Sequence, residues 1–168
     1  CDVVFHVAAL AAVWGPAIDF HRTNVIGTRN VIQACRLEGV TRLIYTYSPS
    51  LVFDGHDQEG IDEKTPYPEK FLAHYPRTKA MAEREVLASN DTQLSTVALR
   101  PHLVWGPGDR HLIPRIAERA CAGTLRWIDR PGVLIDATYI ENAIDAHIAA
   151  MQALLTSKAC CGKVYFIS

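Results

Sequence analysis

The chain has 168 residues, of which 49% are hydrophobic and 21% are charged, a balance typical of one soluble globular domain with a sizeable core. The formal net charge is −1 and the Lys and Arg residues are scattered, which argues against a nucleic-acid partner. No apolar run is long enough to cross a bilayer, and the first residues lack the pattern of a signal peptide, so neither a membrane segment nor a leader is expected.

The five cysteines form no Cys-x-x-Cys pair, and Cys160 and Cys161 are adjacent. This spacing suits neither a disulfide framework nor a tetrahedral metal site. We therefore expect free thiols, a cytoplasmic location and no metal. The sequence begins with Cys1 in the middle of an apolar run, which predicts that it is a fragment of a longer polypeptide.

Buried strands and amphipathic helices alternate along the chain. Residues 1–9 are apolar almost without alternation, which predicts a strand buried on both faces. A helix is predicted over residues 17–37 and a second strand over 42–47, followed by a long polar loop to about residue 74. The remaining expectations are a helix over 76–89, a strand over 94–99, a loop over 100–110, a helix ending near 123, short strands at 125–128 and 133–136, a helix over 139–155 and a strand over 163–167. This alternation predicts an α/β fold with a parallel sheet.

Tyr75 and Lys79 are four residues apart in the predicted helix, so both side chains lie on one helical face. A phenol ionises near pH 10, and a lysine charge about 4 Å away supplies roughly the 4 kcal/mol needed to lower that pKa by about three units. Pro76 disfavours helical dihedral angles at the residue before it, so we expect the register of this pair to be approximate. The pattern by itself is equally typical of a surface tyrosine beside a solvated lysine.

Ser48 follows the second predicted strand, at the carboxyl edge of the sheet where open α/β folds bind their ligands. A hydroxyl there is suited to binding a substrate oxygen while the phenol exchanges the proton. Together Ser48, Tyr75 and Lys79 indicate acid–base chemistry at an alcohol or ketone.

Six segments occur in an order and spacing that resemble the extended short-chain dehydrogenases, part of the NAD-dependent epimerase/dehydratase superfamily. They are residues 6–9 (HVAA), 24–28 (NVIGT), 45–53 (YTYSPSLVF), 75–79 (YPRTK), 100–109 (RPHLVWGPGD) and 136–143 (DATYIENA). The set is most similar to the 3β-hydroxysteroid dehydrogenase branch, which includes bacterial reductases of 2-alkyl-3-oxoalkanoates. The resemblance covers the chain from end to end.

The resemblance implies roles for individual residues. Tyr75 would be the general acid/base, Lys79 would lower its pKa and hold the nicotinamide ribose, and Ser48 would position the substrate oxygen. Ala8 and Ala9 would lie against the cofactor, NAD or NADP. The other implied contacts are Pro101 and Leu103 beside the nicotinamide, His102 facing the substrate pocket, and Asn24 shaping the site, although Asn24 and His102 are equally typical of residues without a ligand role.

The resemblance also implies a Rossmann-like doubly wound parallel sheet that lacks its first βαβαβ portion. The sequence contains no Gly-rich turn that would seat a pyrophosphate, and residues 106–108 (GPG) form a loop of another kind. Residues 1–110 would form the second half of the dinucleotide-binding domain, and residues 111–168 a mixed substrate-binding region that returns to the core. The first strand would then present an unpaired edge, which predicts aggregation of the isolated chain. Tyr47 stands where the family usually has serine, which puts the substrate range in doubt.

The expected activity is NAD(P)-dependent interconversion of a secondary alcohol and a ketone on a hydrophobic small molecule. Two alternatives remain open: a nucleotide-sugar epimerase or dehydratase, which uses the same three residues, and a non-catalytic binding protein with this fold. A homodimer is also left open. The scattered histidines argue against a metal hydrolase, and residues 83–85 (ERE) are interpreted as a solvated helix face.

Overall fold

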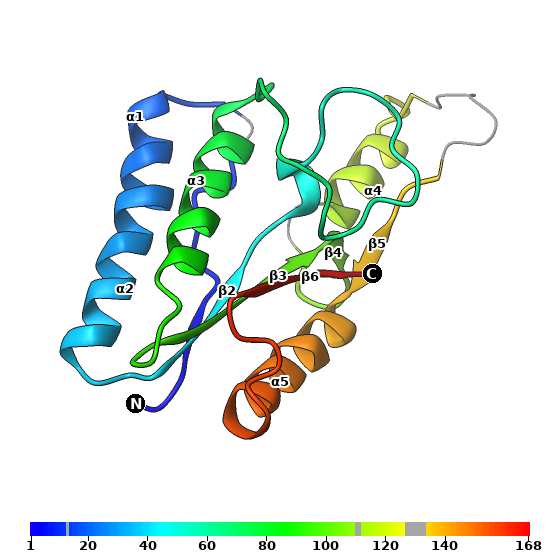
Figure 1. Cartoon of the computed structure of the whole chain (residues 1–168). Coiled ribbons are helices and arrows are strands. Elements are labelled where there is room, and N and C mark those ends of the chain that lie inside the picture. The colour runs from blue at the N-terminus through cyan, green and yellow to red at the C-terminus, as the bar shows by residue number, and fades with distance from the viewer. Residues whose placement is uncertain (13, 110–111, 127–133) are drawn as a thin grey trace.

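The computed structural model describes residues 1–12, 14–109, 112–126 and 134–168. Its centre is a four-stranded parallel sheet in the order β1-β2-β3-β6 (Figure 1). The strands are β1 (Val4–His6), β2 (Arg42–Thr46), β3 (Ser95–Pro101) and β6 (Lys163–Ile167). All three pairings are parallel, so every strand ends at the same edge of the sheet.

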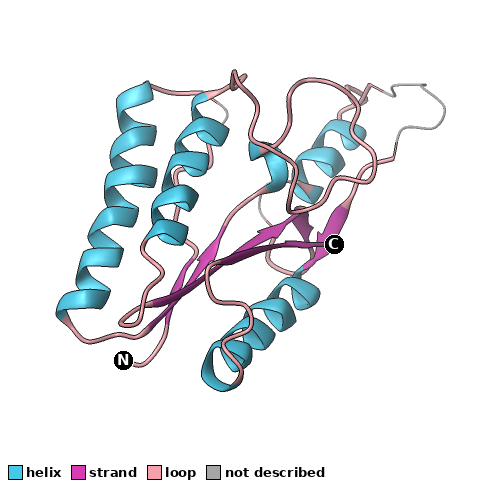
Figure 2. Ribbon diagram, viewed as in Figure 1, coloured by secondary structure: helices cyan, strands magenta, loops and turns pink. Residues whose placement is uncertain are grey.

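Helices cover both faces of this sheet (Figure 2). One face carries a continuous helix made of α1 (Ala17–Phe20), a π-helical turn η1 (His21–Ile26) and α2 (Gly27–Leu37), with α3 (His74–Ala88) beside it. The other face carries α5 (Ile140–Thr156). The predicted α/β class with a Rossmann-like parallel sheet is therefore confirmed.

Residues of β2 alternate between two separate cores. Leu43 and Tyr45, together with Tyr47 just after the strand, pack on the face of α2 and α3, whereas Ile44 joins the core beneath α5. β3 lies between two strands, and all seven of its residues are buried. This is the pattern of a strand covered on both faces.

A smaller unit stands off the main sheet. The parallel pair β4 (Leu103–Trp105) and β5 (Ala137–Tyr139) joins the end of β3 to the start of α5, and the amphipathic α4 (Ile113–Cys121) lies beyond it. Gly106 ends β4 with a φ of +140°, and a Cβ atom there would lie 2.6 Å from Cγ2 of Ile140. Glycine at this position therefore allows β4 to approach the first turn of α5.

Most predicted elements are confirmed, and the differences concern strand ends. The first strand is shorter than expected because β1 is an edge strand that pairs with β2 alone among the described residues, and Phe5 is 43% exposed rather than buried. β3 continues through Arg100 and Pro101, where a loop was expected, because both residues pair with β6. Whether the isolated chain aggregates stays a prediction.

The region after α4 was predicted less accurately. Residues 134–136 form no strand, and the pairing starts one residue later, at Ala137. Of the strand expected at 125–128, residues 127 and 128 lie outside the described part of the chain, as does residue 133, and residues 125 and 126 are irregular. The division into regions at residue 110 stays a prediction, although α5 and β6 do pack on the main sheet. No helix among the described residues is long and apolar enough to span a membrane.

Candidate active site

Two hydrogen bonds fasten the first turns of α3 to the carboxyl end of β2. Lys79 Nζ donates to the carbonyl oxygen of Thr46 at 3.0 Å, and the Tyr47 hydroxyl donates to the carbonyl oxygen of Pro76 at 3.0 Å. Ser48 and Tyr75 are the immediate neighbours of Tyr47 and Pro76. The structure thus brings Ser48, Tyr75 and Lys79 to one edge of the sheet.

Tyr75 lies inside α3, which begins one residue earlier. The expected disturbance of its register by Pro76 is wrong, because the amide nitrogens of a first helical turn have no partner within the helix and proline is tolerated there. Tyr75, Lys79 and Glu83 are therefore spaced by one turn each along one face of α3.

Lys79 is 2% exposed, so its ammonium group is largely removed from water. Nζ lies 4.3 Å from the ring centre of Tyr45 and 5.2 Å from that of Tyr47, and these faces attract a cation. Burial lowers the pKa of Lys79 to about 7, and the charge of Glu83 opposes this change. Lys79 therefore changes its charge in the neutral range.

The Tyr75 phenol is half-buried, and burial raises its pKa. The lowering of this pKa that was expected from Lys79 is wrong for this structure, because burial disfavours the ionised phenol. The negative charge of an ionised Tyr75 contributes to raising the pKa of Tyr45 and Tyr47, after burial, so the phenol lies within electrostatic reach of the end of β2. At neutral pH Tyr75 holds its proton.

Ser48 is half-buried and begins the short 3-10 helix η2 (Pro49–Leu51). Its Oγ accepts a hydrogen bond from the backbone nitrogen of Ser50 at 3.5 Å. Accepting this bond leaves the hydroxyl proton of Ser48 able to point toward a ligand.

Tyr47, the departure from the family pattern, lies in the core. It is 4% exposed, its ring stacks on that of Tyr45 at 6.3 Å, and its hydroxyl binds α3. The side chain of Tyr47 therefore points into the core and supports the position of α3.

Ala8 and Ala9 follow β1 in an irregular segment, with Ala8 exposed and Ala9 half-buried. Asn24 holds this segment, because its Oδ1 accepts from Leu10 N at 2.8 Å and its Nδ2 donates to Leu10 O at 3.2 Å. The same Nδ2 reaches Thr78 Oγ1 at 3.1 Å. Asn24 thus connects the segment of Ala8 and Ala9 to the helix that carries Tyr75.

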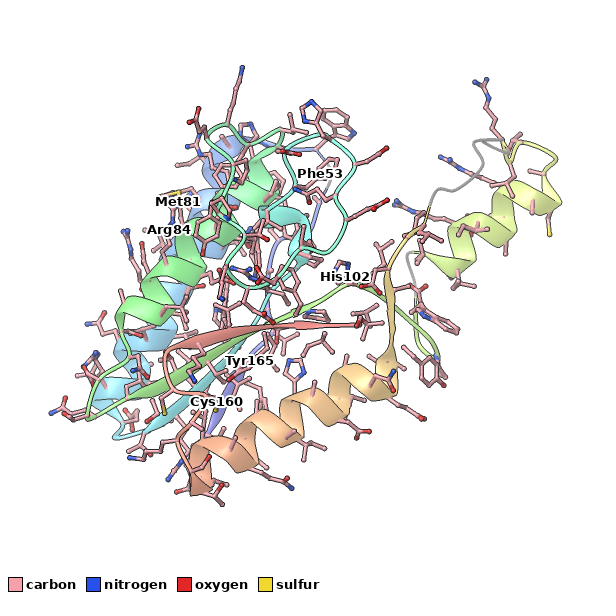
Figure 3. All side chains as sticks on the ribbon, turned by 45° about the vertical axis from the view of Figure 1, so that its right-hand side comes forward. Phe53, Met81, Arg84, His102, Cys160 and Tyr165 are labelled. Atoms are coloured by element: carbon pink, nitrogen blue, oxygen red, sulfur yellow. The ribbon has the colours of Figure 1, made fainter. Side chains whose placement is uncertain are left out.

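The residues at and just after the end of β3 differ in burial. Pro101 is buried, whereas Leu103 in β4 is 50% exposed. His102 lies beside the end of β6 (Figure 3), where its backbone nitrogen donates to Ile167 O at 3.0 Å and its ring packs 5.9 Å from that of Phe166. Nε2 of His102 is 3.5 Å from an oxygen of Asp136. The structure gives His102 partners within the fold, and its contact with a substrate stays a prediction.

An apolar cavity of about 510 Å³ opens at the strand ends on the side of α5. Thr46 and His147 are its polar residues. His147 Nδ1 lies 2.6 Å from Ala143 O and must donate there, so Nε2 accepts from the Thr46 hydroxyl at 2.7 Å. Thr46 is therefore bonded to helices on both faces of the sheet, because its carbonyl oxygen accepts from Lys79 on α3 and its hydroxyl group binds His147 on α5. Nothing in the local sequence pattern indicates this role. The apolar lining residues are Phe5, Val7, Pro101, Val104, Ile140, Ala143, Ile144 and Ile148.

Glu83 is completely buried, so the expectation of a solvated face at residues 83–85 is wrong for its first member. Its carboxylate receives Arg100 NH2 at 2.6 Å and Arg100 Nε at 3.0 Å, and the Tyr67 hydroxyl at 2.5 Å. The sequence signal that was overlooked is its spacing of four from Lys79. Glu85 does face solvent, where it pairs with Arg29.

An open parallel sheet covered by helices on both faces, with polar side chains at its carboxyl edge, defines the Rossmann-like class of α/β proteins. The model of the 3-beta hydroxysteroid dehydrogenase/isomerase family matches residues 1–168, and the chain belongs to this family. Among the described residues, no group of three or more His, Cys, Asp or Glu side chains is placed to hold a metal ion.

Three comparisons place the chain among known proteins. It is 52% identical to a 2-alkyl-3-oxoalkanoate reductase of Stenotrophomonas maltophilia over 99% of this chain and 51% of that protein. It is 37% identical to the human decarboxylating sterol-4-alpha-carboxylate 3-dehydrogenase over 99% of this chain and 46% of that protein. The UDP-glucuronic acid 4-epimerase of Bacillus cereus, solved with NAD, superposes with a TM-score of 0.81 at 26% identity, over 99% of this chain and 53% of that one. The chain therefore spans about half the length of these relatives.

Proposed function

We propose that the protein is an NAD(P)-dependent oxidoreductase that reduces a ketone on a hydrophobic substrate of the 2-alkyl-3-oxoalkanoate type. The observation that carries the proposal is the attachment of the Tyr75–Lys79 helix to the strand end that precedes Ser48, through the bonds to Thr46 and from Tyr47. The substrate class is supported by the 52% identity to a reductase of that name over nearly the whole chain.

The raised pKa of Tyr75 favours the direction of reduction. Because the phenol is protonated at neutral pH, it is ready to donate a proton to the oxygen of a ketone that is becoming an alcohol. Ser48 binds that oxygen through its free hydroxyl proton. Lys79, when charged, stabilises the phenolate that is left behind.

The residues present suit the nicotinamide half of a dinucleotide. Within the described part of the chain, the Lys79 ammonium donates one hydrogen bond, so two of its N–H groups are left for a ribose diol. Ala8 and Ala9 are small side chains at the end of β1, and Pro101 borders an apolar cavity. A bound nicotinamide would supply the hydride. We propose NAD or NADP as the cofactor and the cytoplasm as the location.

The decisive assay uses the complete product of the gene, with purified NADH or NADPH and a long-chain 2-alkyl-3-oxoalkanoate, and follows the absorbance of the reduced cofactor. We expect oxidation of the cofactor, and we expect Tyr75→Phe to lower kcat by about 10²–10⁴-fold, the usual contribution of a positioned acid. Tyr165→Phe is the matched control, because Tyr165 lies on β6 at the opposite edge of the sheet from β1 and is 37% exposed. Full activity of Tyr75→Phe would refute the proposal.

A nucleotide-sugar epimerase is the second candidate, because the solved structure with a TM-score of 0.81 is one. The same preparation should therefore be incubated with UDP-glucose, UDP-galactose and UDP-glucuronic acid. Conversion of a sugar nucleotide without reduction of the oxoalkanoate would replace the proposed function by this one. A protein that binds cofactor but turns over neither substrate class would be the non-catalytic alternative.

A further inference from the structure

The buried charges next to the candidate site do not balance. Lys79 and Arg100 are 2% and 3% exposed, and Glu83 is completely buried between their helix and strand. Burying a charge is unfavourable unless an opposite charge compensates it. The described residues here include two buried cations and one buried carboxylate.

Arg100 takes the larger part of that carboxylate. Its two nitrogens bind both oxygens of Glu83 in a bidentate pair at 2.6 and 3.0 Å, while its NH1 has no hydrogen-bond partner among the described residues. Glu83 also accepts from Tyr67, whose ring lies under the guanidinium group of Arg84 at 4.3 Å. These contacts hold the Glu83 side chain in one orientation on α3.

Lys79 has no other anion to face among the described residues. Its surroundings are two neutral aromatic rings, the carbonyl of Thr46 and a histidine that burial keeps neutral. The titratable groups around the pair are Tyr75 and Glu83 on α3, Tyr45 and Tyr47 on β2, His6 on β1, Arg100 on β3 and Tyr67 in the loop before α3. Glu83 is the one carboxylate in this described set.

We propose that Glu83 is a positioning residue of the candidate active site: held by Arg100 and Tyr67, its carboxylate is the counter-charge that keeps the buried Lys79 an ammonium ion. The inference rests on the proposed function for its catalytic consequence, since the charged form of Lys79 stabilises the Tyr75 phenolate. Along α3 the phenol of Tyr75, the ammonium group of Lys79 and the carboxylate of Glu83 then follow one another at successive turns. Removing the anion leaves the cation to lose its proton.

The direct test is a titration of Lys79 in the complete gene product, carried out by NMR with ¹³C-labelled lysine and assigned with Lys79→Arg. In Glu83→Gln, which keeps the size of the side chain, we expect the pKa of Lys79 to fall by about one unit or more below its value near 7, the usual effect of losing a close opposite charge. Glu85→Gln is the matched control, because Glu85 is on the same helix and also pairs with an arginine, but in solvent. An unchanged titration in a folded Glu83→Gln protein overturns the proposal.

Glu83→Gln leaves Arg100 buried without its partner, so this variant risks unfolding. The double variant Glu83→Gln/Arg100→Gln avoids this unpaired cation. It also removes a positive charge, so its reference is the single variant Arg100→Gln, and the pKa of Lys79 should be lower in the double variant than in Arg100→Gln. Equal titration of Lys79 in the folded double variant and in Arg100→Gln would also overturn the proposal.

The catalytic consequence appears in the pH profile of ketone reduction. The alkaline loss of kcat should move to lower pH by the same interval as the titration of Lys79. Above the wild-type midpoint, the rate should be about tenfold lower than in the wild-type protein for every pH unit by which the midpoint has moved, and the loss should be small only below the midpoint of the variant. A purely structural role would lower kcat equally at every pH. If the wild-type protein reduces no ketone, the proposed function fails and the NMR titration still decides the role of Glu83. If reduction occurs and the titration is unmoved, only the role of Glu83 is refuted.

Discussion

Asn24 on the long first helix donates through Nδ2 to Thr78 Oγ1 on α3 at 3.1 Å, and both side chains are almost fully buried. Thr78 lies one residue before Lys79. Its hydroxyl group donates a hydrogen bond to the carbonyl oxygens of the first turn of α3. Since Asn24 also binds both backbone polar groups of Leu10, one amide side chain joins three segments of the candidate site.

We predict that Asn24→Ala destabilises the protein by about 1–3 kcal/mol, because it leaves the backbone groups of Leu10 without their partners. The segment of Ala8 and Ala9 should loosen, so the KM for the nicotinamide cofactor should rise. Chemical denaturation and cofactor titration measure the two effects. Asn30→Ala, at an exposed position of α2, should change neither. If Asn24→Ala and Asn30→Ala had the same free energy of unfolding and the same KM for the cofactor, Asn24 would have no role in the site.

Replacing Tyr47 by Phe removes the bond to the Pro76 carbonyl and keeps the stacked ring. A single hydrogen bond of this kind contributes about 0.5–1.5 kcal/mol, and we expect a loss of that size in the free energy of unfolding. Because the ring lies in the core, the ratio of kcat/KM values for short and long substrates should stay as in the wild-type protein. A changed substrate preference would show that Tyr47 borders the pocket instead.

His6 should make the protein sensitive to acid. Burial, and then the charge of Lys79, lower the pKa of His6 to about 4, whereas an unfolded histidine titrates near 6.5. Between these values the unfolded state binds the extra proton, so stability falls as the pH is lowered through this window and is retained above about 6.5. The integrated loss is roughly 2–3 kcal/mol.

The measurement for His6 is the urea midpoint between pH 7 and pH 4. The hydroxyl group of Thr28 donates to Asn24 O, so it accepts the hydrogen bond from His6. The comparison variant is His6→Gln, because glutamine retains a nitrogen donor for this bond and does not titrate. Carboxylates titrate in both proteins, so the difference between the two curves isolates the imidazole. Parallel curves would mean that His6 keeps an ordinary pKa.

Gly106→Ala should destabilise the protein by more than about 2 kcal/mol, because the added Cβ meets Ile140 Cγ2 at 2.6 Å in addition to the unfavourable φ. Gly108 provides the control, since its φ is also positive and nothing lies within 4 Å of a Cβ built there. Gly108→Ala should lose only about 1 kcal/mol. Thermal unfolding of the two variants separates the steric effect from the conformational one, and similar melting temperatures would exclude the close approach to α5.

The local sequence pattern predicted most of the helices and strands. It also predicted that Ser48, Tyr75 and Lys79 lie at one edge of the sheet. The strand Lys163–Ile167 and the helix with Tyr75 and Lys79 depend on periodicity and breakers, which a sequence displays directly. The partner of Glu83 was not accessible in this way, because Arg100 is 17 positions away, on a strand whose end was mistaken for a loop. The rise in the pKa of Tyr75 was missed for a related reason. The sequence shows the spacing between Tyr75 and Lys79, whereas burial of the phenol depends on the residues that the whole fold packs around it.

The wide turn of η1 (His21–Ile26) determines how the first helix presents Asn24 to the end of β1. A π-helical turn accommodates one residue more than an α-helical turn, and deleting one residue there would return the helix to regular geometry. Because the extra residue is accommodated within the turn, the parts of the helix before and after it would keep their faces, and the deletion would mainly displace the residues of the turn itself. Asn24 lies in this turn, so the loop that follows the first strand would lose its anchor although no side chain at the sheet edge had been changed and although α2 still held Thr28 against His6.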